Sequence, residues 1–251
     1  MRLLCTNDDG IDAGGLHAIR DELAAHYTID VVAPATVQSA KSHSLTLGEP
    51  LMVEKRNFGD WDGTAVAGSP ADCVKLAVDA ILPQRPDAVV SGINHGANSG
   101  INVVYSGTVA AAIEGAFLGL PAIALSLHFD KDADNDLHRA ARWSLPVVEK
   151  LLPTLGKGEV VNVNLPALPA GESPKGIHVC RQCVRPYVDT YEHRISPGGR
   201  DYYWNNSQFR LDSTDADTDV AMLRDKYITV TPLQFDLTKR GQMEGLVGLF
   251  S

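Results

Sequence analysis

The feature that most constrains the fold of this chain is an alternation of short apolar runs with longer segments of helical periodicity. The predicted strands are residues 2–6, 29–33, 88–91, 122–127 and 159–165. The predicted helices between them are residues 15–26, 70–82, 108–118 and 137–152. Strands and helices that alternate in this way form a parallel sheet through right-handed crossovers. The sequence therefore predicts an α/β protein.

The pattern changes in the last third of the chain. Residues 175–251 are richer in polar and aromatic side chains and are divided by Pro and Gly turns. Here we expect strands at residues 176–184, 202–204 and 227–232, and a short helix at residues 220–224. We therefore divide the chain into a core of residues 1–170 and an extension of residues 171–251 that adds to the sheet and forms a hairpin, the two making one structural unit.

The charge balance excludes several classes of protein. The 251 residues carry 22 Lys and Arg against 31 Asp and Glu, a net charge of −9. An acidic surface without a basic patch repels polyanions, so we expect no binding to nucleic-acid polymers or to anionic membranes. The apolar region at residues 109–127 is interrupted by Glu114 and Pro121, and no segment has the length of a signal peptide or a membrane span. We expect a cytoplasmic protein.

The loop after the first strand carries two adjacent carboxylates, Asp8 and Asp9. In a parallel sheet, ligands bind beyond the carboxyl ends of the strands, where the strand order reverses. Carboxylates about 4–5 Å apart repel by roughly 3–4 kcal/mol at a dielectric near 20, and a cation would reverse the sign. The simpler alternative is an Asx turn with solvated acids. A dinucleotide fingerprint is missing, which disfavours a dehydrogenase.

Two more loops follow predicted strands. Residues 34–44 contain several hydroxyls, which mean little alone. Residues 92–100 and 105–108 combine glycines, two asparagines and the start of a helix, whose N–H groups can bind an anion. The alternative is a glycine-rich turn with a hydroxyl N-cap. Together the loops offer only oxygen ligands, which suit Mg²⁺, Mn²⁺ or Ca²⁺. A hard cation beside an anion site indicates phosphoester hydrolysis.

The motifs in these loops resemble those of the SurE survival protein family. The matching blocks are TNDDG at 6–10, Ser39 followed by SLT at 44–46, GSPADCV at 68–74, SGIN at 91–94 with Gly96 and Asn98, YSGT at 105–108, and Tyr227 followed by TPL at 231–233. They occur in family order and cover nearly the whole chain. The resemblance implies a Rossmann-like core of three αβα layers with a projecting carboxyl-terminal β-hairpin. It also implies a homodimer or homotetramer that exchanges carboxyl-terminal segments.

The same resemblance implies the activity and its residues. Members of the family are metal-dependent phosphatases of nucleoside 5′-monophosphates, with 3′-monophosphates as further candidate substrates. One divalent cation, Mg²⁺ or Mn²⁺ with Ca²⁺ as an alternative, would be held by Asp8, Asp9, Ser39 and Asn94. The phosphate would be contacted by Asn98, Ser106, Gly107 and Thr108, and catalysis would depend on Asp8, Asp9, Asn98 and Ser106.

The mechanism we expect is direct hydrolysis. The cation would act as a Lewis acid on a phosphate oxygen and activate the attacking water, while Asn98, Ser106 and helix N–H groups stabilise the spreading charge. An aspartyl-phosphate of the haloacid-dehalogenase type needs acids at positions i and i+2, which Asp8 and Asp9 do not supply. The general acid is unassigned among His43, His95 and His128.

One departure from the family pattern leaves an alternative open. The family usually has arginine before the metal-binding serine, where this chain has Gln38, and Lys41 could restore a positive charge nearby. Gln38 therefore motivates a second hypothesis, a nucleotide or phosphate sensor that keeps the cation site without turnover. The acidic segment at residues 212–219 imitates a calcium loop but lacks its glycine and terminal glutamate, so we interpret it as a solvated loop.

Overall fold

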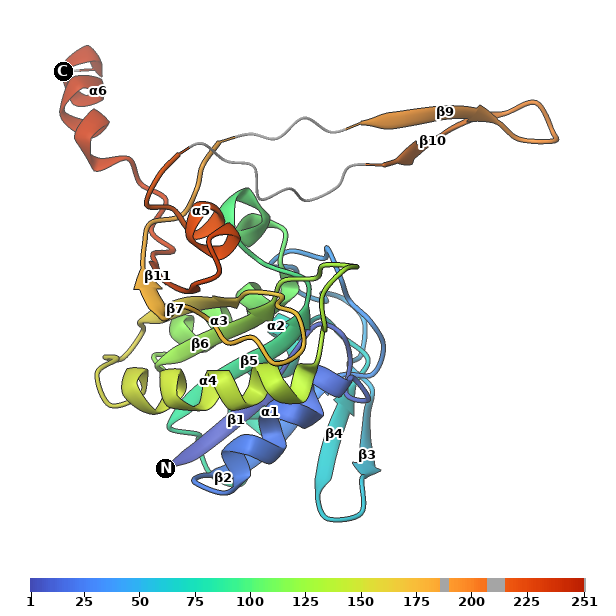
Figure 1. Ribbon diagram of the computed structural model, residues 1–251, viewed down its shortest axis with the longest axis vertical. Coiled ribbons are helices and arrows are strands. Elements are labelled where there is room, and N and C mark those ends of the chain that lie inside the picture. The colour runs from blue at the N-terminus through green and yellow to red at the C-terminus, as the bar shows by residue number, and fades with distance from the viewer. Residues whose placement is uncertain (186–189, 207–214, 251) are drawn as a thin grey trace.

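The computed structural model describes residues 1–185, 190–206 and 215–250. Its centre is a nine-stranded sheet with helices on both faces (Figure 1). The strands of this sheet are β1 (Arg2–Thr6), β2 (Thr28–Pro34), β3 (Val53–Asn57), β4 (Asp62–Val66), β5 (Ala88–His95), β6 (Ala122–Leu127), β7 (Val160–Leu165), β8 (Ile177–Val179) and β11 (Ile228–Leu233). The helices beside it are α1 (Gly14–Ala24), α2 (Pro70–Leu76), α3 (Gly107–Phe117), α4 (Leu137–Leu151) and α5 (Asp219–Arg224).

The strand order of the sheet is β3-β4-β2-β1-β5-β6-β7-β11-β8. The six strands from β4 to β7 run parallel, while β3 and β11 pair antiparallel with their neighbours β4 and β7. The chain winds from β1 to β2 in one direction and returns to β5 on the other side of β1. The order therefore reverses between β1 and β5, and the predicted α/β fold with a parallel sheet is confirmed.

Side chains alternate across β1 into two apolar layers. Leu3 and Cys5 pack with residues of α1 and α4, whereas Leu4 packs with residues of α2 and α3. A strand that is buried on both faces in this way has no polar side and reads as a continuous apolar run. This is why the short strands of the core could be predicted from hydropathy alone.

The structure differs from the predicted elements where strands are exposed or interrupted. The hairpin of β3 and β4 was not predicted, because β3 is polar and largely exposed. The strand expected at residues 88–91 continues as β5 to His95, with a register shift against β6 between Ser91 and Asn94. The helix expected at residues 70–82 ends in a π-helical turn at Ala77–Ile81. Of the strand expected at residues 176–184, only Ile177–Val179 forms.

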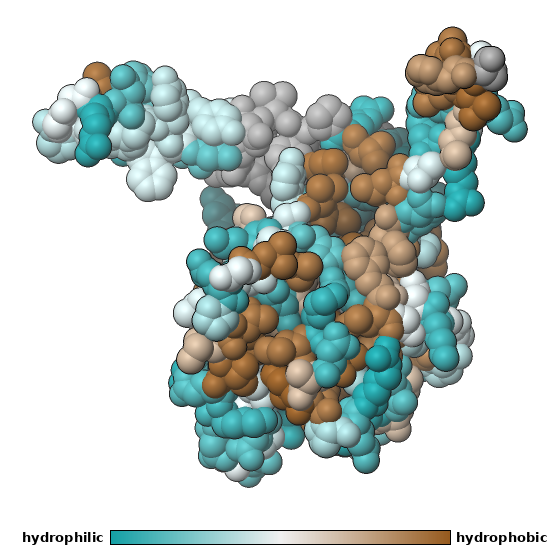
Figure 2. All heavy atoms as spheres, turned by 180° about the vertical axis from the view of Figure 1, so that it is seen from behind, coloured by the Kyte–Doolittle hydropathy of each residue, from teal (hydrophilic) through white to brown (hydrophobic). Residues whose placement is uncertain are grey.

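Two strands of the extension join the central sheet, and two others form a separate sheet. Strand β11 lies between β7 and β8, whereas β9 (Tyr191–Ile195) and β10 (Asp201–Asn205) form a separate antiparallel hairpin that projects from the body (Figure 1). The unpredicted helix α6 (Met243–Phe250) ends the described chain away from the sheet, and its apolar side chains are exposed (Figure 2). The division at residue 170 stays a prediction. No helix in the described part of the chain is long and apolar enough to cross a membrane.

A capping box begins α2. Ser69 Oγ accepts from the Asp72 N–H at 3.1 Å, and Asp72 Oδ2 accepts from the Ser69 N–H at 2.8 Å. Asp72 Oδ2 also accepts from Thr46 Oγ1 at 2.7 Å. Burial alone would raise the pKa of Asp72, but the hydrogen bonds from Thr46 and Ser69 outweigh it and lower the pKa. The ionised carboxylate therefore fastens the loop after β2 to the start of α2.

We expect Asp72→Asn to destabilise the protein by about 1–2 kcal/mol at neutral pH, because it weakens a cap and a charge-assisted bond. A carboxyl with a lowered folded-state pKa stabilises above its unfolded pKa, and the effect is lost as the pH falls through the folded value. The difference from the parent should therefore shrink below pH 3.8, the unperturbed value. Urea unfolding at pH 7 and at acidic pH measures it. Asp60→Asn, at an exposed position, is the control, and an equal loss at both pH values would contradict the prediction.

Candidate functional site

A cavity of about 220 Å³ lies where the strand order reverses, at the carboxyl ends of β1 and β5. This is the crevice where ligands bind in open parallel sheets. Six of the residues singled out from the sequence line it together. They are Asp8, Asp9, Ser39, Asn94, Asn98 and Ser106. Gly107 and Thr108 do not line the cavity but lie directly behind Asp8.

The turn after β1 is built by Asn7. Its Nδ2 donates to Gly10 O at 2.9 Å and its Oδ1 accepts from the Gly10 N–H at 3.2 Å. Gly10 has φ +99°, a conformation that glycine adopts without steric cost. An Asx turn is therefore present, but it belongs to Asn7. Asp8 is only 3 % exposed and contributes to the cavity wall, so the alternative of solvated acids is wrong for this residue.

Asp8 packs against the first turn of α3. Thr108 Oγ1 donates a hydrogen bond to Asp8 Oδ1. A Cβ on Gly107 would lie 2.7 Å from Asp8 Cβ and 2.9 Å from Asp8 Oδ2, which is closer than atoms can approach. Only glycine at this position therefore permits the observed contact between helix and carboxylate.

Both carboxyl groups are harder to ionise than ordinary aspartates. Burial raises the pKa of Asp8, and the neighbouring charge of Asp9 raises it further, while the bond from Thr108 acts in the opposite direction. Burial also raises the pKa of Asp9, opposed by the His95 N–H, which donates to Asp9 Oδ2 at 3.2 Å. A bound cation would relieve the repulsion between these two acids.

The other oxygen donors come from β5 and the loop after β2. Asn94 Nδ2 donates to Gly96 O at 2.7 Å, so the carboxamide oxygen is the atom left to bind a cation. Ser39 lies at the exposed rim of the cavity. Among the residues that the structure describes, no group of three or more His, Cys, Asp or Glu could hold a metal. The oxygen donors that line the cavity are two carboxylates, an amide and a hydroxyl, which are ligands that suit a hard cation.

Ser106 at the N-terminus of α3 and Asn98 also line the cavity. Ser106 is the N-cap of α3, and its Oγ accepts from the Val109 N–H at 3.0 Å. The first N–H groups of a helix have no partner within the helix and carry a partial positive charge, so they attract an anion. Asn98 is 8 % exposed, and its Nδ2 donates to Ser126 Oγ at 2.9 Å.

The three candidate histidines lie in different places. His95 lines the cavity. His43 instead pairs with Glu114, Nε2 to Oε2 at 2.8 Å, and lines a neighbouring apolar cavity. His128 does not line the described cavities, and burial lowers its pKa. Of the three, the structure brings only His95 to the site.

Gln38 reaches the site with its backbone alone. Its N–H donates to Asp8 O at 2.7 Å. Its side chain donates to Thr36 Oγ1 at 3.2 Å and, with Lys41, lines a separate cavity of about 380 Å³. The structure therefore does not bring Lys41 to the acid pair, so the suggestion that it replaces the family arginine finds no support in this geometry.

Two features of the site were not predicted. Asn162 and Asn164 on β7 hold the backbone of Asn98, although neither lines the cavity. Their signal was present in the sequence, since two asparagines interrupt the apolar run VVNVNL at alternate positions. The second unpredicted feature is Asn102, which lines the cavity beside Tyr105 of the predicted segment 105–108.

The acidic segment at residues 212–219 is resolved into separate contacts, with residues 212–214 outside the described residues. Asp215 pairs with Arg181 at 2.8 Å and Asp217 with His178 at 2.8 Å. Asp219 is fully buried and accepts from three backbone N–H groups, those of Gly100, Cys183 and Val220. The prediction of a solvated loop is therefore wrong for Asp219.

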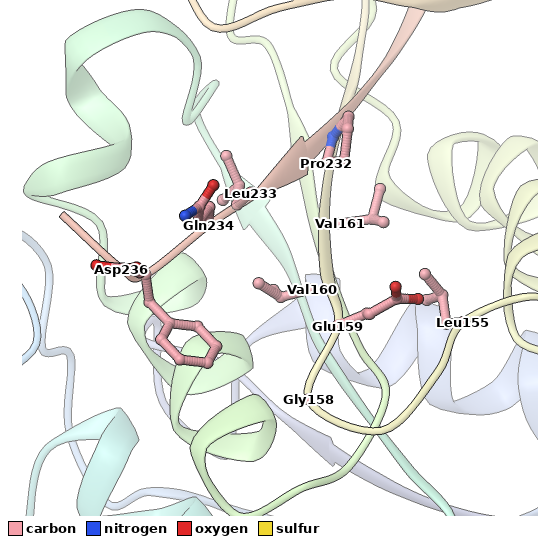
Figure 3. A pocket seen from close by; sticks show the side chains of 10 residues that line it. Leu155, Gly158, Glu159, Val160, Val161, Pro232, Leu233, Gln234 and Asp236 are labelled. Carbon is pink, nitrogen blue, oxygen red and sulfur yellow. The ribbon is translucent and has the colours of Figure 1, made fainter. Parts of the chain in front are cut away.

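A further cavity of about 390 Å³ lies at the opposite end of β7. It is lined by Val160 and Val161 of β7, by Pro232 and Leu233 at the end of β11, and by the segment that follows β11 (Figure 3). None of the residues predicted to bind the cation or the phosphate lines it.

Comparisons with known proteins identify the family to which the chain belongs. The sequence model of the family "Survival protein SurE" matches residues 3–189. The 5′-nucleotidase SurE of Nitratidesulfovibrio vulgaris strain DP4 is 45 % identical over 251 residues, 99 % of each chain. That of Flavobacterium johnsoniae is 43 % identical, covering 97 % of this chain and 95 % of its own. The crystal structure of the SurE protein from Aquifex aeolicus superimposes with a TM-score of 0.86 at 36 % identity, covering 100 % of both chains. The chain belongs to the SurE family.

Proposed function

We propose that this chain is a divalent-cation-dependent 5′-nucleotidase that hydrolyses nucleoside monophosphates to nucleoside and phosphate. The observation that carries the proposal is the shared cavity of the acid pair Asp8 and Asp9 and the capped start of α3 at Ser106. Adjacent acids favour a cation, and a helix N-terminus favours an anion. A metal-bound phosphate ester satisfies both at once. The names of the relatives, 5′-nucleotidase SurE, support the same activity.

The residues of the cavity then divide into two groups. Asp8, Asp9, Ser39 and Asn94 would hold one cation, Mg²⁺ or Mn²⁺, which when bound supplies Lewis-acid activation of phosphate and water. Asn98 and Ser106, with the N–H groups of Gly107 and Thr108, bind the phosphate and stabilise the charge that spreads over its oxygens during hydrolysis. Thr108 and Gly107 also fix Asp8 by direct contact. Nucleoside 3′-monophosphates are included as further substrates.

Two parts of the proposal concern the cellular form of the protein. The apolar side chains of α6 are exposed at the end of a projecting segment (Figure 2). Burying them against another copy of the chain supports a homodimer or homotetramer, since large exposed apolar patches mark interaction sites. The four cysteines are free and buried, which suits the reducing conditions of the cytoplasm.

We expect chelator-stripped protein to release phosphate from nucleoside 5′-monophosphates only after Mn²⁺ or Mg²⁺ is restored. Asp8→Asn should reduce this release by about a thousandfold or more, because it removes a charge from the proposed cation site. It should also raise the Tm of the metal-free protein at pH 7 by about 2–4 °C, or roughly 1 kcal/mol. The sign follows because a carboxyl with a raised folded-state pKa destabilises the fold when ionised.

A colorimetric phosphate assay and a thermal melt measure the two effects, with Asp21→Asn, at an exposed acid on α1, as the control. Release that persists without metal would contradict the cation site. Binding of nucleotide and metal by a folded protein, without release, would favour the sensor.

We expect Gly107→Ala to lower kcat/KM by about 10- to 100-fold, because the added Cβ displaces Asp8 and small displacements in a catalytic site are costly. Gly14→Ala is a matched control. It also changes the first residue of a helix, and its Cβ would meet only Leu137 Cδ1 at 3.6 Å, an ordinary contact. Steady-state kinetics of both variants provide the comparison, and equal kinetics would show that Asp8 tolerates the shift.

We expect Gln38→Arg to change kcat/KM by less than about threefold, the scale of substitutions away from specific contacts. The reason is that the side chain at this position points into the separate cavity of about 380 Å³ and does not lie beside Asp8 and Asp9. Kinetics at saturating Mn²⁺ test the prediction, with Gln38→Ala as the comparison. A tenfold rise would mean that an arginine reaches the phosphate from this position.

A further inference from the structure

Three buried polar side chains on two neighbouring strands converge on Asn98. They are Ser126 on β6 and Asn162 and Asn164 on β7, and all three are 0 % exposed. Asn162 and Asn164 are two residues apart and therefore share one face of the sheet. Ser126 is the direct partner of Asn164 in the parallel register of β6 and β7.

The carboxamide of Asn164 forms hydrogen bonds with both the N–H and the carbonyl oxygen of Asn98. Its Oδ1 accepts from the Asn98 N–H at 2.8 Å, and its Nδ2 donates to Asn98 O at 3.3 Å. Asn162 Nδ2 donates to the same oxygen at 2.7 Å. Both peptide groups that flank the Asn98 Cα are thus fixed by residues more than 60 positions away in the sequence.

The side chain of Asn98 is oriented by the third residue. Asn98 Nδ2 donates to Ser126 Oγ at 2.9 Å. A carboxamide nitrogen has two N–H groups, so one is used by Ser126 and the other can donate to an oxygen in the cavity that Asn98 lines. Backbone and side chain are therefore both set before a ligand arrives.

Holding Asn98 in this way carries a cost for the fold. Asn162 Oδ1 is buried without a hydrogen-bond partner among the described residues. A buried polar atom left unpaired costs about 1–3 kcal/mol, whereas an apolar residue would fit a β-strand without that loss. The donor of Asn162 is the part that is used, and its only described target is Asn98 O.

We propose that Asn164, assisted by Asn162 and Ser126, is a positioning residue that presets Asn98 for the phosphate. The inference rests on the proposed function, in which Asn98 contacts the phosphate. Asn164 itself touches no substrate. It acts by fixing where the Asn98 carboxamide can donate, which is the preorganisation that hydrolysis of a phosphate ester requires.

A double-mutant cycle tests this route. Asn164→Leu should lower kcat by about 10- to 100-fold and raise KM by about tenfold, because a misaligned Asn98 loses its contact with the phosphate in the bound ester as well as in the transition state. In an Asn98→Ala background, the same substitution should cost less than about twofold further. Losses that multiply in the double variant, or an unchanged kcat in the single one, would overturn the proposal.

Ser126→Ala provides a second test in case Asn164→Leu does not fold. It removes one hydroxyl, and we expect a kcat loss of about three- to tenfold that disappears in the Asn98→Ala background. Thr229→Val is the matched control, since Thr229 lies opposite Asn164 in the register of β11 and β7, is also 0 % exposed, and has no described contact with Asn98. The control should leave kcat and KM at the parent values.

Calorimetric titration with inorganic phosphate in the presence of Mn²⁺ separates this inference from the proposed function. Asn164→Leu and Asn98→Ala should each weaken phosphate binding by about tenfold or more, and the double variant no further. If the parent binds phosphate and shows this pattern but releases none from any ester, the proposed hydrolase fails and the positioning role stands. If phosphate binding is unaffected by Asn164→Leu, the positioning role fails whatever the activity.

Discussion

The site depends on how closely the first turn of α3 approaches the end of β1. Gly107 has no side chain to hold the helix away, and Thr108 reaches across to bond Asp8. Since α3 follows β5 and β5 pairs in parallel with β1, the sheet register itself places these groups together. A carboxylate thus meets the positive end of a helix dipole. The same contact puts the proposed cation site beside the proposed phosphate site.

The two buried carboxylates destabilise the fold locally, and contacts elsewhere in the structure compensate for this loss. Burial raises the pKa of Asp8 and Asp9, so their ionised forms are disfavoured in the fold. Residues that follow Ser39 in the same loop make contacts that hold the loop in place. Burial would raise the pKa of Glu114 in α3, but His43 from this loop and Lys75 from α2 lower it. The ion pairs around the buried Glu114 and the Asp72 cap connect this loop to α3 and α2.

Sequence patterns identified the site residues whose role depends on their own loop, and missed those whose role depends on contacts with distant parts of the chain. Asp8, Asp9 and the capped start of α3 stand out because each loop directly follows a strand and carries its own turn chemistry. The shift in β5 and the exposed β3 leave no hydropathy signal, since neither alternates or runs apolar. Asn164 and Asp219 take their roles from partners 66 and 119 residues away, which no local pattern can supply.

These two distant residues hold one loop from opposite sides. Asn164 fixes Asn98 from within the sheet, and Asp219 accepts from the Gly100 N–H out of the extension. The Asp219 carboxylate also accepts from the Cys183 N–H, so one side chain connects the loop at Gly100 to the segment that follows β8. Removing residues after 170 would remove this hydrogen bond together with Val220 and Cys183, which pack against Gly100. The loop that carries Asn98 is therefore held by residues on both sides of position 170, whereas the hydrogen-bond partners described for the Asp8 and Asp9 side chains all lie before it.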